Sequence, residues 1–205
     1  MSQNNQKPLK QALRKKIKSQ RNSLSKLEKQ VAAKKLLNQF IRSPEFLKYQ
    51  HIALYLSNDS EIDTTPIIKK AWSLGKTCYL PVLSPFSKKL TFVKYTPHSP
   101  LKKNRYNIPE PYLLKQNIRS TWSLDVVLTP LVAFDKNGNR LGMGGGFYDQ
   151  TFAFKKNRKS GKPLLIGLAY SFQQQKKLHV EHWDVCLDKA FTDQAAYDFT
   201  NSYSP

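Results

Sequence analysis

One apolar run constrains the fold of this 205-residue chain more than any other feature. Residues 124–132 are almost continuously apolar, and Val126, Val127 and Leu128 stand together in the run. A run without alternation is typical of a strand that is buried on both faces, as strands are in the middle of a parallel sheet. Because such a sheet needs helices on both sides, the run favours an α/β protein.

The rest of the chain alternates between helical and strand patterns. Leu9, Leu13 and Ile17 recur every four residues and predict a first helix over residues 7–20. Ser25 followed by Glu28 has the spacing of a capping box and predicts a second helix, which we expect to end near residue 43. Further helices are expected at 64–74, 148–157 and 173–178, further strands at 51–56, 77–83, 90–96, 164–170 and 190–195, and a long loop at 97–121.

These patterns predict a single three-layer α/β domain over residues 1–205, with a mostly parallel central sheet flanked by helices. Residues 1–8 are expected to be disordered. No apolar run approaches the length of a membrane span, and the N-terminus has no apolar segment typical of a signal peptide. Cys78 and Cys186 lie far apart and are typical of reduced thiols. We therefore expect a cytoplasmic protein, and a monomer.

A glycine-rich segment follows the apolar run, with Arg140 before it and Tyr148 and Asp149 after it. Four glycines fall in five positions: Gly142, Gly144, Gly145 and Gly146. Glycines let successive backbone N–H groups point into one concavity and let an anion approach closely. The segment matches neither the Walker loop nor the dinucleotide-binding fingerprint. A flexible turn is the alternative, but the flanking cation, ring and carboxylate favour a phosphate-binding loop. We expect it to leave the C-terminal end of the 124–132 strand, where open α/β sheets bind ligands.

The formal net charge of +20 is compatible with two kinds of partner. Basic proteins often bind nucleic acid, and basic residues cluster here at 7–21 and 155–162. The sequence holds no RNA-recognition motif, and His179, His182 and Cys186 match no strong zinc pattern. Steering of anionic small molecules explains the same charge. We expect such a ligand rather than nucleic acid, with a basic RNA-associated module as the alternative.

Several motifs occur in a characteristic order. The most specific is the string from Phe134-Asp135 through Gly138-Asn139-Arg140-Leu141 to Gly142-Met143-Gly144-Gly145-Gly146-Phe147-Tyr148-Asp149. The others are K-x-x-L-R at 10–14, E-I-x-T at 61–64, N-I-P-x-P at 107–111 and D-x-x-x-D at 184–188. In these motifs the chain resembles the 5-formyltetrahydrofolate cyclo-ligases, also called 5,10-methenyltetrahydrofolate synthetases, from about residue 10 to residue 191.

The resemblance implies an enzyme that converts 5-formyltetrahydrofolate into 5,10-methenyltetrahydrofolate and splits ATP into ADP and phosphate. The formamide carbon is a poor electrophile and its oxygen a poor leaving group. Phosphorylation of the formyl oxygen would solve both problems, and N10 would then attack. The protein would have to align the reactants and neutralise charge, without a covalent nucleophile. Another ATP-using enzyme with the same loop is a further alternative.

The resemblance also implies which residues bind ATP. Lys10 and Arg14 match positions that contact ATP, and their spacing places them on one helical face. Without the resemblance, a solvated basic face would explain both. Arg140 is expected to act in catalysis by neutralising charge. The stretch that wraps the phosphates is Arg140, Leu141, Gly142, Met143, Gly144, Gly145, Gly146, Phe147 and Tyr148.

Folate and magnesium positions follow from the same resemblance. Leu56, Glu61 and Tyr106 are expected to contact the folate, although Leu56 is equally compatible with a core position. The folate is also expected to border Met143, Gly144, Gly145, Gly146 and Phe147. Asp149 and Asp184 are expected to hold Mg²⁺, which prefers oxygen ligands, and Asp188 is a weaker candidate.

The chain departs from the family pattern at Gly145, where many relatives carry a lysine. That departure removes one candidate cation at the γ-phosphate. Arg140, Lys10 or Mg²⁺ would then have to neutralise more of the charge.

Overall fold

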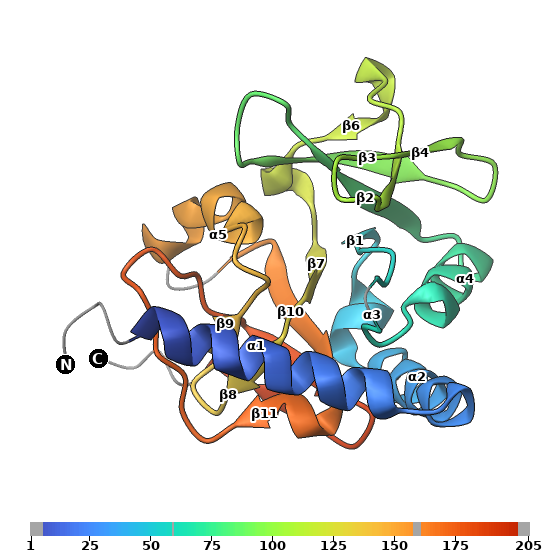
Figure 1. Ribbon diagram of the computed structural model, residues 1–205. Helices are drawn as coiled ribbons and strands as arrows, with labels where there is room; N and C mark the ends of the chain where they lie inside the picture. Colours follow the sequence, from blue (N-terminus) through green and yellow to red (C-terminus); the bar gives the residue numbers. More distant parts are fainter. Residues whose placement is uncertain (1–5, 59, 158–160, 201–205) are drawn as a thin grey trace.

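The computed structural model describes residues 6–58, 60–157 and 161–200 (Figure 1). The expected disorder over residues 1–8 is wrong for 6–8, which begin helix α1, while 1–5 lie outside the described residues. Within the described ranges, no helix is long and apolar enough to cross a membrane. The α-helices are α1 (Gln6–Ser23), α2 (Lys26–Phe40), α3 (Pro44–Lys48), α4 (Thr65–Ser73) and α5 (Phe147–Thr151).

An eight-stranded mixed sheet forms the centre of the molecule. Its strand order is β13 (Ala196–Asp198), β12 (Lys189–Thr192), β10 (Leu164–Ala169), β7 (Val126–Pro130), β1 (His51–Ala53), β2 (Thr77–Leu83), β3 (Leu90–Tyr95) and β6 (Ile118–Arg119). The five strands from β12 to β2 run parallel, and the outer strands pair antiparallel. The predicted central strand is confirmed, because β7 lies between β10 and β1.

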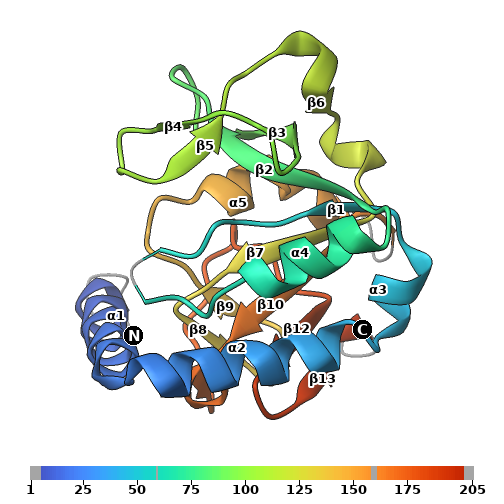
Figure 2. The same cartoon turned by 90° about the vertical axis from the view of Figure 1, so that its right-hand side faces the viewer.

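Alternating residues of β7 face two different cores. Val126 and Leu128 pack with Ile67 of α4 and Leu36 of α2 on one face. Val127 packs on the other face with aromatic residues that include Phe152, next to α5. All three strand residues are fully buried, which explains why the run carries no polar alternation. Figure 2 shows α2 and α4 in front of the sheet, so the predicted three-layer architecture is confirmed.

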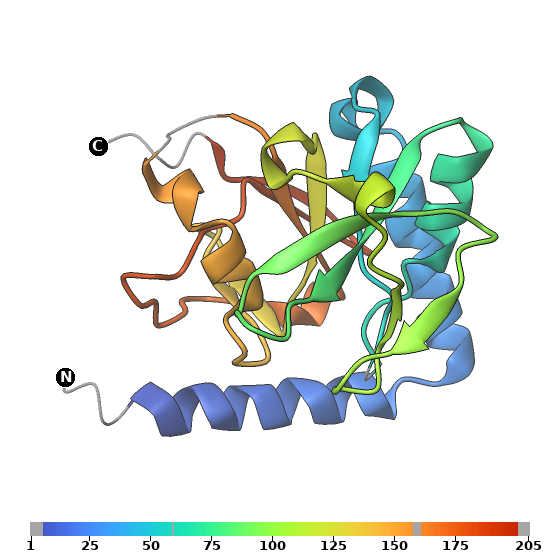
Figure 3. The same ribbon diagram turned by 90° about the horizontal axis from the view of Figure 1, so that it is seen from above.

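Helix α1 lies along one side of the molecule, outside the layers of the main sheet (Figure 3). Ile17 is its fully buried apolar residue, and it packs with Val132, Leu141 and Leu178. These partners lie in or beside a small three-stranded sheet of β11 (Gln174–Gln175), β8 (Ala133–Asp135) and β9 (Arg140–Leu141). The contact fixes α1 beside the chain segment that enters the glycine-rich loop.

The start of α2 is formed as the sequence predicts. The Ser25 hydroxyl accepts a hydrogen bond from the Glu28 N–H at 3.2 Å, and the Glu28 carboxylate accepts one from the Ser25 N–H at 2.7 Å. The helix ends at Phe40, and a short helix α3 that the sequence analysis did not separate follows it. Its start is capped by Ser43, whose side chain accepts a hydrogen bond from the Phe46 N–H.

The predicted loop over 97–121 contains a β-hairpin. Strands β4 (Leu101–Lys103) and β5 (Pro109–Pro111) pair antiparallel, and β6 joins the edge of the main sheet. The Asn104 side chain closes the hairpin by accepting hydrogen bonds from the N–H groups of Tyr106 and Ile108. Asn107 has a φ of +61°, which asparagine tolerates better than most residues.

The predicted helix over 173–178 is wrong: a 3-10 turn (Ser171–Gln173) and strand β11 occupy this segment. The Gln173 side chain donates hydrogen bonds to the carbonyls of Leu131 and Val132, and it accepts one from the Tyr170 N–H. These side-chain bonds replace the bonds that a helix would have made.

Several other predicted helices and strands begin or end at different residues in the structure. The strand expected over 51–56 ends at Ala53, and the one expected over 190–195 spans 189–192 before a turn into β13. The helix expected over 148–157 divides into α5 and a 3-10 helix (Ala153–Asn157). The glycine-rich loop does not leave β7 directly, because β8 and β9 intervene.

Candidate active site

The glycine-rich loop joins β9 to α5 and takes backbone conformations that favour glycine. Gly144 has a φ of +103°, and Gly146 has a φ of +68° at the position before the first residue of α5. No side chain caps this helix. The first N–H groups of a helix have no partner within the helix. The loop and the start of α5 therefore offer backbone donors of the kind that bind phosphate.

Helix α1 brings one of its two predicted ATP-binding residues to this loop. Arg14 Nε donates a hydrogen bond to the Gly142 carbonyl at 2.9 Å. The same guanidinium lies 3.6 Å from the point where a Cβ on Gly144 would stand. Burial lowers the pKa of Arg14, which nevertheless keeps its charge at neutral pH. Lys10 instead pairs with Glu181 at 3.0 Å.

Arg140 is buried, and its side chain contacts Asp149 and the backbone of Val185. Its guanidinium pairs with Asp149 Oδ1 at 2.7 Å and donates to the Val185 carbonyl. Asp149 Oδ1 also accepts a hydrogen bond from the Val185 N–H at 3.1 Å. Arg140 and Asp149 thus connect β9, α5 and the segment around Val185. The exposed fraction of the Arg140 side chain is 4 %, which separates this cation from bulk water.

Asp149 and Asp184 lie near enough to influence each other electrostatically. Burial raises the pKa of Asp184, and the negative charge of Asp149 raises it further, against the opposing charges of Lys10 and Arg140. Asp184 Oδ2 accepts a hydrogen bond from the Glu181 N–H at 2.8 Å. Among the described residues, Asp149 Oδ2 and Asp184 Oδ1 have no hydrogen-bond donor.

Two neighbouring carboxylates with one uncommitted oxygen each are compatible with a hard divalent cation. No group of three or more His, Cys, Asp or Glu side chains in the described part of the chain could hold a metal. Mg²⁺ commonly binds one or two carboxylates and completes its shell with water and phosphate oxygens, so the pair fits that ion. The weaker candidate Asp188 is committed elsewhere, because it pairs with Lys155 and accepts a hydrogen bond from the Leu165 N–H.

The predicted folate-binding residues come from three separate segments. Burial raises the pKa of Tyr148, and the charge of Glu61 raises it further, so Glu61 lies close to the end of the glycine-rich loop. Glu61 also accepts a hydrogen bond from the Asn58 N–H at 3.0 Å. Leu56 is half-buried and packs against the core beside α2 and α4, which agrees with the core alternative.

The hairpin between β4 and β5 reaches the same loop. The ring of Tyr106 meets the ring of Phe147 edge to face, with 6.0 Å between the centroids. Sequence analysis missed Arg105, whose guanidinium lies 5.2 Å from the Tyr106 centroid and 5.9 Å from that of Phe147. The sequence feature that could have identified Arg105 is its position directly before the aromatic residue Tyr106. Tyr106 is half-exposed, and so is Met143 at the loop.

Comparisons with known proteins identify the family. The 5-formyltetrahydrofolate cyclo-ligase family model matches residues 6–193. The chain is 45 % identical over 178 residues to the 5-formyltetrahydrofolate cyclo-ligase of Haemophilus influenzae, covering 86 % of this chain and 94 % of that protein. It is 39 % identical over 184 residues to the Escherichia coli K12 protein of the same name, covering 89 % and 100 %.

A solved structure shares the fold. The Aquifex aeolicus 5,10-methenyltetrahydrofolate synthetase superposes with a TM-score of 0.79 at 30 % sequence identity, and the match covers 96 % of each chain.

Proposed function

The chain belongs to the 5-formyltetrahydrofolate cyclo-ligase family, and from this premise we propose that the site around the glycine-rich loop carries out the reaction of that family. The enzyme is an ATP-dependent ligase that converts 5-formyltetrahydrofolate into 5,10-methenyltetrahydrofolate. One observation supports the assignment to this site most directly: three separate segments of the chain meet there. Helix α1 and the β4–β5 hairpin contact the loop, and residues 181–185 contact Arg140 beside it.

In the proposed chemistry, the formyl oxygen attacks the γ-phosphorus and ADP departs with the electrons of the broken P–O bond. N10 then attacks the activated carbon to close the ring, and the N10 proton and the phosphate both leave, so that the product carries a positive charge shared by N5 and N10. The protein supplies position and charge rather than a covalent nucleophile. Backbone N–H groups of residues 142–147 would bind the phosphates, and Arg14 would neutralise charge alongside them.

We propose that Lys10 and Arg14 bind ATP with residues 140–148, and that Leu56, Glu61, Tyr106 and residues 143–147 form the folate side. The hydrogen bond from Arg14 to Gly142 and the ring contact between Tyr106 and Phe147 support these two assignments. Arg140 would contribute by positioning Asp149, because its guanidinium already contacts that carboxylate and the Val185 carbonyl. Arg14 is then the better candidate for the charge that the lysine supplies in relatives.

We propose that Asp149 and Asp184 hold Mg²⁺. When bound, the ion would supply positive charge that stabilises the negative charge of the phosphates. Two observations support the proposal: burial and, to a lesser extent, the charge of Asp149 raise the pKa of Asp184, and Asp149 is held in a fixed orientation between Arg140 and the Val185 N–H.

We also propose that the chain works in the cytoplasm as a monomer built of one domain. Neither Cys78 nor Cys186 forms a disulfide within the described residues, which suits a reducing compartment. Strands drawn from residues 51–198 share one sheet, which suits a single domain.

The test combines the protein, MgATP and 5-formyltetrahydrofolate and follows the absorbance of the methenyl product together with ADP release. We expect both products in equal amounts, and neither without ATP. ADP release that does not depend on the folate would instead indicate a different ATP-using enzyme. Absence of both products from folded protein would overturn the proposal.

A further inference from the structure

One buried arginine in the structure has no charged partner. Arg21 stands in the last turn of α1, and only 1 % of it is exposed. Its Nε has no hydrogen-bond partner among the described residues, and the ion pairs of those residues do not include it. A buried cation is costly unless it is paired and hydrogen-bonded. The burial of Arg21 therefore needs an explanation other than packing.

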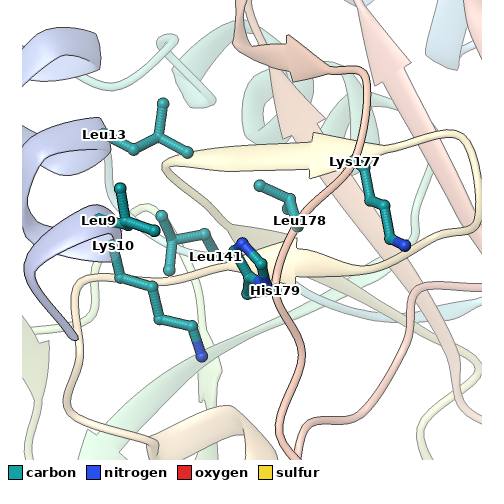
Figure 4. Close-up of a pocket in the computed structure, with 7 residues that line it drawn as sticks. All are labelled: Leu9, Lys10, Leu13, Leu141, Lys177, Leu178 and His179. Carbon is teal, nitrogen blue, oxygen red and sulfur yellow. The ribbon is translucent and has the colours of Figure 1, made fainter. Parts of the chain in front are cut away.

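The inward direction of Arg21 follows from the way α1 is held. In the first half of the helix, Leu13 lines a pocket together with Leu141 and Leu178 (Figure 4). One turn later, Ile17 is buried against the same two leucines. Arg21 is four residues further on, so it lies on the same face of the helix. The contact that fixes α1 therefore also fixes Arg21 inside the molecule.

Two buried tyrosines lie within electrostatic reach of Arg21 at the carboxyl end of the main sheet. Tyr55 follows β1 and Tyr170 follows β10, the two strands on either side of β7. Burial raises the pKa of Tyr170 to about 12 and that of Tyr55 well above its ordinary value, and the charge of Arg21 opposes both increases. The Tyr170 hydroxyl has no hydrogen-bond partner in the described part of the chain. Open α/β sheets bind ligands at this end of their strands.

Tyr55 also connects Arg21 to the proposed folate side. The negative charge of Glu61 raises the pKa of Tyr55, so this tyrosine lies near both a cation and a carboxylate. The neighbouring residues are bonded directly, because Ser60 Oγ donates a hydrogen bond to Asn22 Oδ1 at 2.7 Å. Arg21 precedes Asn22 and Glu61 follows Ser60. The end of α1 therefore brings the charge of Arg21 to the segment that holds Glu61.

We propose that Arg21 is a positioning residue of the folate site, whose buried positive charge attracts the Glu61 carboxylate and holds it where it can accept hydrogen bonds from the substrate. Opposite charges attract strongly over several ångströms where water is excluded. Arg21 acts through Glu61 and does not need to touch the substrate. The proposal rests on the proposed function, because it takes Glu61 to bind the folate. It assigns a role in that site to a residue that no sequence motif marks.

The test removes the charge of Arg21 and keeps most of its volume. Arg21→Met is neutral, and Arg21→Lys retains a positive charge on an unbranched chain. The matched control is Lys16→Met, which removes one positive charge from an exposed position of the same helix. For each protein, KM is measured separately for 5-formyltetrahydrofolate and for ATP, together with kcat and the thermal midpoint of unfolding.

We expect Arg21→Met to raise the KM for the folate about tenfold, with the KM for ATP unchanged and kcat reduced less than the folate KM is raised. Arg21→Lys should recover most of this loss, and Lys16→Met should resemble the parent. Arg21→Met should keep or raise the thermal midpoint, because an apolar chain replaces a buried charge that has no close partner. An Arg21→Met protein that does not fold would overturn the proposal, and so would equal increases in the two KM values or no recovery in Arg21→Lys.

A double-mutant cycle with Glu61→Gln tests whether Arg21 acts through Glu61. Because Glu61→Gln already removes the negative charge, adding Arg21→Met should raise the folate KM by less than about threefold more. Effects of the two substitutions that simply add would show that Arg21 acts independently of Glu61, and would overturn the proposal. A parent that does not convert 5-formyltetrahydrofolate would remove the proposed function. An active parent with the same folate KM as Arg21→Met would remove this inference alone.

Discussion

Two regions of the molecule hold their aspartates in opposite ways. At the amino end of β7, Asp125 pairs with Lys162 and accepts hydrogen bonds from the N–H groups of Gln50 and His51. Burial by itself would raise the pKa of Asp125, but the combined effect of these partners is larger, and the pKa is lowered. Beside the glycine-rich loop, Asp184 is also partly buried, yet it faces another carboxylate and its pKa is raised.

The difference distinguishes an aspartate with a structural role from the proposed metal-binding pair. The carboxylate of Asp125 is supplied with donors by the protein itself, so it stabilises the junction of β1 and β7. Asp149 and Asp184 each keep one carboxylate oxygen without a donor among the described residues, which a cation could bind. Substitutions in the two regions should therefore affect different measurements: stability for the first and ligand binding for the second.

The largest effect is expected for Gly144→Val. Its φ of +103° strains a β-branched residue, and the side chain would stand where phosphate has to approach. Misplacement of a reacting group by about 1 Å can cost a factor of 10², so we expect turnover to fall ~100-fold or more. Calorimetry with ATP and a turnover assay measure the change.

The matched control is Gly75→Val, because Gly75 also has a positive φ, +69°, but lies after α4. Both variants should lose about 1–3 kcal/mol of stability to backbone strain. Only Gly144→Val should lose nucleotide binding. If the control lost it equally, the loop would have no special role in binding.

A smaller loss is expected for Asp149→Asn, at least about tenfold in apparent Mg²⁺ affinity during turnover, with a lesser loss for Asp184→Asn. The order follows from orientation, since Asp149 is fixed by Arg140 and the Val185 N–H, whereas Asp184 is held by the Glu181 N–H in its own turn. Asparagine keeps the acceptor oxygen for Arg140, so folding should be retained. Turnover is titrated with Mg²⁺, and a greater loss in Asp184→Asn would contradict the proposed order.

In the region around Asp125, we expect a substitution to change the stability of the protein and not its activity. Asp125→Asn should lower the free energy of unfolding at pH 7 by about 1 kcal/mol, because a charged acceptor of two backbone N–H groups becomes neutral. The lowered pKa means that the native state binds this proton less readily than the unfolded state. The contribution is therefore present above the unfolded pKa of about 3.9 and is lost as the pH falls through the folded pKa.

Denaturant unfolding of the parent and Asp125→Asn between pH 7 and pH 3 measures this dependence. The difference in stability between the two proteins should shrink towards the acid end, and turnover at pH 7 should be equal. A constant difference in stability across the range would show that the charge of Asp125 is not responsible.

The smallest effect is expected for Glu181→Gln. This change releases Lys10 from its ion pair, so Lys10 could interact more freely with phosphate. Partly exposed pairs contribute about 0.2–1 kcal/mol, which corresponds to a change of roughly 1.4- to fivefold in ATP affinity. Calorimetry with ATP should show tighter binding. Weaker binding would indicate that Glu181 itself supports the nucleotide site.

Local features of the sequence were sufficient for the main elements of the fold. The apolar run at 124–132 predicted β7, because a strand buried on both faces needs apolar residues throughout. The spacing of Ser25 and Glu28 predicted the start of α2, because a capping box joins residues only three apart. The glycine-rich loop was also predictable, since positive φ at Gly144 and Gly146 is a property of the residues themselves.

The predicted helix over 173–178 failed because a side chain in it bonds to backbone groups that are far away in the sequence. Gln173 accepts a hydrogen bond within its own turn but also binds carbonyls more than 40 residues away, so the apparent helix over 173–178 did not form. The hairpin within the predicted loop has a local cause instead: the Asn104 side chain accepts hydrogen bonds from N–H groups two and four residues further on, and the hairpin carries Tyr106 and Arg105 to the site.

The sequence by itself determined the α/β class, the glycine-rich loop and, through its motifs, the family. The tertiary structure decided which charges meet: Arg140 pairs with Asp149, Arg14 reaches the loop, and Lys10 pairs with Glu181. It also shows that a Cβ at Gly145 would lie 2.6 Å from the Phe147 ring, so a lysine there would have to displace that ring. Backbone propensities act between near neighbours along the chain, whereas the pairing of Lys10 with a residue 171 positions away depends on the packing of α1 against the small sheet.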